Sequence, residues 1–170
     1  MKPESIELYK NLEQNLDDLI KVYRHILGIV RNEKNILISA NLNELNENNR
    51  AKEQMLVKAN QLELARQQSA AELAKSEGLS ESIRLSDFAR HFGGDEGERL
   101  RNMQSVLELL LKRVKEYNAQ NEILVQSALD HVTGAIGHIR DSLGEKPTYK
   151  KSGGKVAAPA EAGQLVSKQA

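Results

Sequence analysis

Three long stretches of this chain repeat apolar residues alternately every three and four positions, and this rhythm narrows the choice of folds more than any other feature. In the first stretch the repeated positions hold Tyr9, Leu12, Leu16, Leu19, Tyr23, Ile26, Val30, Glu33 and Leu37. Glu33 alone interrupts this seam with a charge. A repeat of this length is typical of long helices that pack side by side. We predict a first helix over residues 5–38, and apolar residues beside its seam indicate that it contacts two neighbours.

A stretch rich in asparagine follows, with Asn41, Asn43 and Asn46 within residues 39–49. Asparagine favours turns and helix caps because its side chain competes for backbone hydrogen bonds. We therefore predict a corner between two helices. The second helix is expected over residues 42–76, and its thin apolar stripe needs a partner to fold.

The connector after the second helix carries both phenylalanines of the chain, Phe88 and Phe92. Residues 86–92 show a short helical pattern, and we expect the two rings to close one end of the helix bundle. The glycine-rich run at residues 93–97 predicts the end of this short helix. A third long helix is then expected over residues 97–143.

The third helix changes its apolar phase part-way along. The early seam holds Leu100, Met103, Leu107, Leu110, Val114 and Tyr117. After a polar patch at residues 117–122 the repeat resumes one residue out of step at Val125, Leu129, Val132, Ile136, Ile139 and Leu143. A displaced repeat is a local break in supercoiling. We expect the helix to turn a new apolar face outward here and to capture an amphipathic helix. The alternative is a helix end that faces the core of the chain itself.

The last 26 residues differ in composition from the rest. Residues 145–170 hold five lysines and two glutamates among glycine, alanine and serine, which predicts a flexible basic tail. Tyr149 is the one aromatic residue in it, and is either incidental or a docking anchor. We predict an all-α fold: an elongated antiparallel bundle of three long helices with coiled-coil character and a short connecting helix. Residues 1–144 would form this helical domain.

Composition and the N-terminal sequence predict a soluble, cytoplasmic chain. The formal net charge is zero, so the overall charge does not indicate nucleic-acid binding. The absence of cysteine fits a reducing compartment. The N-terminus lacks the apolar run of a signal peptide, and no apolar stretch approaches the roughly 20 residues of a membrane span.

No residue pattern indicates catalysis or a cofactor. His131 and His138 are seven residues apart on one predicted helix, about 10 Å by helical rise, which is too far to share a metal ion. The run 93–97 precedes a helix, but no strand leads into it and its two acids would repel a phosphate. We expect no enzyme activity, no metal and no cofactor.

The order of these features resembles the FlgN family of flagellar export chaperones. A leucine-rich first helix and a second helix rich in glutamate and lysine precede a third helix that carries Asn118, Asn121, Leu124, Ser127, Leu129 and Val132. The run Pro147-Thr148-Tyr149-Lys150-Lys151-Ser152-Gly153 is similar to the Tyr-x-x-x-Gly ending of the family. The likeness covers residues 5–153. One departure is His131, where the family usually has an aromatic residue.

The resemblance implies a cytoplasmic chaperone that binds the C-terminal helical segments of hook-filament junction proteins, prevents their early polymerisation and delivers them to the export gate. The implied client-binding residues are Leu124, Leu129, Val132, Ile136, Ile139 and Leu143, and Tyr149 would contact the cytoplasmic domain of the gate. The alternative is a structural coiled-coil protein that associates with itself through its heptad seams.

Overall fold

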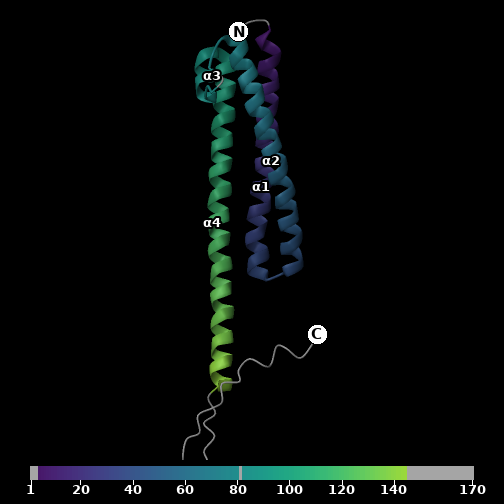
Figure 1. Cartoon of the computed structure of the whole chain (residues 1–170), viewed down its shortest axis with the longest axis vertical. Coiled ribbons are helices and arrows are strands. Elements are labelled where there is room, and N and C mark those ends of the chain that lie inside the picture. Colours follow the sequence, from purple (N-terminus) through teal and green to yellow (C-terminus); the bar gives the residue numbers. More distant parts are fainter. Residues whose placement is uncertain (1–3, 81, 145–170) are drawn as a thin grey trace, which may run out of the picture. The chain divides into compact units, whose positions relative to one another are not determined.

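All regular elements in the described part of the chain are helices, as predicted (Figure 1). The computed structural model describes residues 4–80 and 82–144. The four helices are α1 (Ser5–Ser39), α2 (Leu42–Glu77), α3 (Leu85–Phe92) and α4 (Gly94–Gly144). The predicted tail, residues 145–170, lies outside the described residues.

Helices α1 and α2 form an antiparallel hairpin and run side by side (Figure 1). The corner between them is tight: Ala40 takes the left-handed conformation at φ 52°, and the side chain of Asn41 accepts a hydrogen bond from the backbone N–H of Glu44 at 3.3 Å. This bond satisfies one of the free N–H groups that begin every helix. The asparagine signal in the sequence therefore marks a helix cap.

A first core cluster joins all four helices near the short helix α3. Its fully buried side chains include Leu12 and Leu16 of α1, Leu73 of α2, Phe88 of α3 and Leu100 of α4. The predicted role of the phenylalanines is confirmed, since Phe88 is fully buried and its ring stacks on Phe92 at a centroid distance of 5.9 Å.

Helix α4 begins at Gly94, three residues earlier than the sequence pattern indicated. Gly93 and Gly94 both have positive φ, 61° and 48°, so the chain reverses between α3 and α4 without a longer loop. The backbone N–H of Gly97 donates to the Gly93 carbonyl at 2.7 Å. A Cβ at Gly97 would collide with the carbonyl oxygen of Ala89, so only glycine lets α4 approach α3 this closely.

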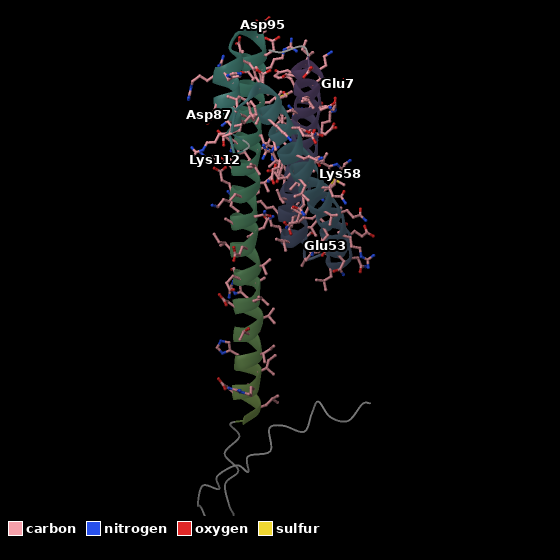
Figure 2. All side chains as sticks on the ribbon, turned by 45° about the horizontal axis from the view of Figure 1, so that its top comes forward. Glu7, Glu53, Lys58, Asp87, Asp95 and Lys112 are labelled. Carbon is pink, nitrogen blue, oxygen red and sulfur yellow. The ribbon has the colours of Figure 1, made fainter. Side chains whose placement is uncertain are left out.

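A second core cluster lies further along the hairpin. Ile26 and Val30 of α1, Ala59 of α2 and Leu110 of α4 are buried in it. Charged residues such as Glu53, Lys58 and Lys112 lie on the outside of the helices (Figure 2). Helices α1 and α2 and the first half of α4 thus have one apolar side that packs and one charged side that meets water.

Tyr9 ties α1 to the start of α4. Its hydroxyl donates a hydrogen bond to the Glu96 carbonyl at 2.9 Å, and only 4% of the residue is exposed. Burial, reinforced by the neighbouring Glu13 carboxylate, raises the pKa of Tyr9 to about 12. The neutral phenol is therefore the form that the fold stabilises.

This shift predicts alkaline destabilisation of the fold. Because the pKa of Tyr9 is higher in the folded than in the unfolded chain, its contribution is complete below about pH 10 and disappears as the pH rises towards 12. The Tyr9→Phe variant should lose about 1 kcal/mol at neutral pH with its hydrogen bond, and its stability should fall less steeply above pH 10. Urea unfolding of both proteins over this range measures the difference. Equal slopes would show that the Tyr9 hydroxyl is not held by the fold.

Candidate protein-binding surface on α4

Only the first half of helix α4 packs into the core clusters, and the helix continues well beyond them. The chain divides into two compact units, the first ending at Leu124 and the second beginning at Val125. Asn121, with 4% of its surface exposed, is the last buried residue among those described. The helix itself is uninterrupted to Gly144 (Figure 1). Among the described residues, the second half of α4 therefore has no buried side chain.

Six large apolar side chains along this half are exposed to solvent. We call them the α4 stripe, and their exposed fractions are Val125 41%, Leu129 55%, Val132 57%, Ile136 61%, Ile139 58% and Leu143 73%. Their spacing of four, three, four, three and four residues places them along one side of the helix. Exposed apolar patches are a common feature of protein-interaction sites, which makes the stripe a candidate protein-binding surface.

The predicted client-binding residues fall mostly on this stripe. Five of the six belong to it, whereas Leu124 is half-buried and lies out of step with the repeat. Val125 holds the repeat position beside Leu124 and is more exposed. Tyr149, the predicted gate contact, lies outside the described residues.

A buried polar layer lies just before the stripe, and sequence reasoning did not identify its pairing. Lys52 of α2 donates to both carboxylate oxygens of Glu33 at 2.9 Å. The Asn121 side chain amide donates to the Val30 carbonyl and to Glu33, both at 2.9 Å. The signal was present in the sequence, because Glu33 occupies a seam position of α1 and Asn121 belongs to the polar patch of α4.

This layer explains how a charge is tolerated in the seam. Only 8% of Glu33 is exposed, and a carboxylate so placed is costly unless a cation and hydrogen-bond donors compensate it. Lys52 supplies the cation and Asn121 a further donor. Polar groups at seam positions fix the register of neighbouring helices. The layer therefore fixes where α4 lies along the hairpin before the apolar stripe begins.

Comparison with known proteins agrees with this architecture. The family model described as FlgN protein matches residues 1–157, which is most of the 170-residue chain. The chain belongs to the FlgN family. Membership assigns it the general role of a flagellar export chaperone. Searches of curated proteins and of solved structures found no match.

Two exposed histidines of this FlgN chain lie beside the stripe. His131 and His138 are both exposed and follow the stripe residues Leu129 and Ile136 by two positions. Two residues rotate a helix by about 200°, so neither imidazole belongs to the apolar line. The two histidines therefore leave the stripe continuous.

Within residues 4–80 and 82–144 no group of three or more His, Cys, Asp or Glu side chains could hold a metal ion. In the same residues no helix is both long and apolar enough to cross a membrane. One shallow depression, lined by Asp95, Glu98, Arg99 and Asn102, is polar and open. The α4 stripe, with six exposed large apolar side chains, is the candidate surface for binding a partner.

Proposed function

We propose that the chain is a cytoplasmic chaperone that holds the C-terminal helical segments of hook-filament junction proteins on the α4 stripe. While bound, these segments cannot polymerise, and the complex carries them to the export gate. The observation that carries the proposal is the exposure of six large aliphatic side chains in one heptad line, in a family of flagellar export chaperones. An amphipathic client helix has an apolar face to match them.

The energetics of the stripe suit a chaperone that must also release its client. Covering six aliphatic side chains removes on the order of 600 Å² of apolar surface from water, and at about 25 cal/mol per Å² this gives about 15 kcal/mol. Ordering the client helix and losing its free motion consume much of that gain. Micromolar to nanomolar affinity is the expected range, which protects the client without trapping it.

The test is whether the purified chain binds a junction protein and keeps it from polymerising. Sedimentation of the chain alone and with the C-terminal region of a junction protein should show a heavier species only in the mixture. Light scattering should show delayed polymerisation of the junction protein at equimolar chaperone. If the chain alone formed a stable oligomer that ignored the junction protein, the alternative of a self-associating coiled coil would replace the proposal.

Delivery to the gate is assigned to Tyr149 through the family resemblance. We expect Tyr149→Ala to abolish binding to the cytoplasmic domain of the gate and to leave client affinity unchanged, because an aromatic anchor contributes much of the energy of a small contact. Pull-down by the immobilised gate domain and a parallel client titration measure the two effects. Tyr149→Phe is the matched control and should retain gate binding. Equal loss of both bindings would place Tyr149 in the client site.

A further inference from the structure

The order of side chains along the α4 stripe carries more information than its apolar character. In a heptad the step from position a to position d is three residues and the step from d to a is four. The stripe therefore has Leu129, Ile136 and Leu143 at a, and Val125, Val132 and Ile139 at d. Leucine dominates a, and every d residue is β-branched.

This arrangement is unfavourable for a pair of helices. Two-stranded coiled coils favour β-branched residues at a and leucine at d, whereas leucine at a with isoleucine at d favours three or four strands. The stripe is closer to the second arrangement, with leucine at two of its three a positions and a β-branched residue, valine or isoleucine, at all three d positions. We infer that α4 holds two client helices at once, so that chaperone and client form a three-stranded helical bundle. This inference rests on the proposed function.

The flanks of the stripe are built for the same arrangement. The g positions are Ala128, Ala135 and Ser142, all small and exposed. Thr133 and Gln126 occupy e positions, so the apolar line is bordered by side chains that a second partner helix can cover. A single client helix over the six stripe residues covers on the order of 600 Å² of apolar surface and leaves one flank uncovered. A second helix over that flank would extend the interface.

The flanks also distinguish a client from further copies of this chain. In a bundle of identical chains, e positions meet g positions of the neighbour, and opposite charges there select the partner. Arg140 is the only charged residue at these positions of the stripe, and the g positions of the chain offer it no acid. The complementary partner is a pair of amphipathic helices that places a carboxylate near Arg140.

One variant separates this inference from the proposed function. Exchanging leucine and valine between positions, as Val125→Leu, Leu129→Val, Val132→Leu and Leu143→Val, keeps the composition of the stripe and restores the two-stranded preference. All four side chains are exposed, so circular dichroism and unfolding should be unchanged. The probe is a peptide of a single helix from the C-terminal region of a junction protein.

The measurement is the number of peptides bound per chain, from sedimentation equilibrium and titration. Wild type should bind two and the exchanged variant one, and the intact C-terminal region should bind the variant at least about tenfold more weakly. A second comparison places charge on the flank: Ala128→Glu with Ala135→Glu should weaken binding of the intact region, whereas His131→Glu with His138→Glu should not.

Each other outcome overturns the inference in a different way. One peptide per wild-type chain, with equal affinity for the exchanged variant, would mean a two-stranded complex and leave the proposed function standing. A stable trimer of the chain alone would make further copies the occupant. No binding of either the peptide or the intact region would remove the proposed function together with the inference.

Discussion

Replacing Leu129 and Ile136 by aspartate is expected to abolish binding of the junction-protein C-terminal region. The two side chains are 55% and 61% exposed in the free chain and lie at the centre of the α4 stripe. Burying a carboxylate against an apolar helix without a partner costs several kcal/mol, and the lost apolar contacts add about 1.5–3 kcal/mol for each residue. We expect the dissociation constant to rise by at least about 1,000-fold. Titration calorimetry or fluorescence anisotropy measures it.

The matched control is His131→Asp with His138→Asp. These two positions have the same seven-residue separation on the same half of α4, are exposed, and introduce the same two negative charges off the stripe. The control should bind its client within about threefold of wild type, because screened surface charges contribute little. Both double variants should unfold like wild type. Retained binding in the stripe variant would mean that the client binds elsewhere.

Truncation of Phe88 should destabilise the fold more than any other single change proposed for this protein. The ring is fully buried at the meeting point of all four helices and stacks on Phe92. Phe88→Ala should cost about 3–5 kcal/mol through lost burial and the cavity left behind. For a domain of this size that corresponds to a fall of roughly 10 °C or more in melting temperature.

Val57→Ala on the outer side of α2 serves as its control. Val57 is 60% exposed, so its truncation should change the free energy of unfolding by no more than about 0.5 kcal/mol. Urea unfolding followed by circular dichroism gives both values. If Phe88→Ala and Val57→Ala were equally stable, the short helix α3 would not be part of the core in solution.

The three long helices could be predicted from sequence because each carries a long periodic signal. Between Tyr9 and Val30 the structure buries every seam residue of α1 except Tyr23, which is half-buried. The sequence also predicts where the packed part of α4 ends. The apolar repeat changes phase after residues 117–122, and the last buried residue described, Asn121, lies in that patch. Periodicity reports which side of a helix is apolar, and packing follows from that side.

Other features could not be predicted because they depend on contacts between distant residues. The start of α4 at Gly94 follows from the turn at Gly93 and from the close approach of Gly97 to Ala89, which no local propensity encodes. Likewise, Glu33 was recognisable as an exception in its seam, but its partners Lys52 and Asn121 are 19 and 88 residues away along the chain. The client site stays a prediction, because the exposed stripe of the free chain does not include the contacts that a client would make with it.

The polar layer of Glu33, Lys52 and Asn121 also limits how α4 can respond to its cargo. A slip of one heptad along the hairpin would bring Val114 or Ala128 opposite Glu33 in place of Asn121. Neither replacement can donate a hydrogen bond, so the slipped state would lose the Asn121 donor and leave the Glu33 carboxylate paired with Lys52 alone among these groups. A slip of α4 along the hairpin is therefore unfavourable in both directions. If α4 holds a client as proposed, we expect loading and release to occur without such a slip of the helix along the hairpin.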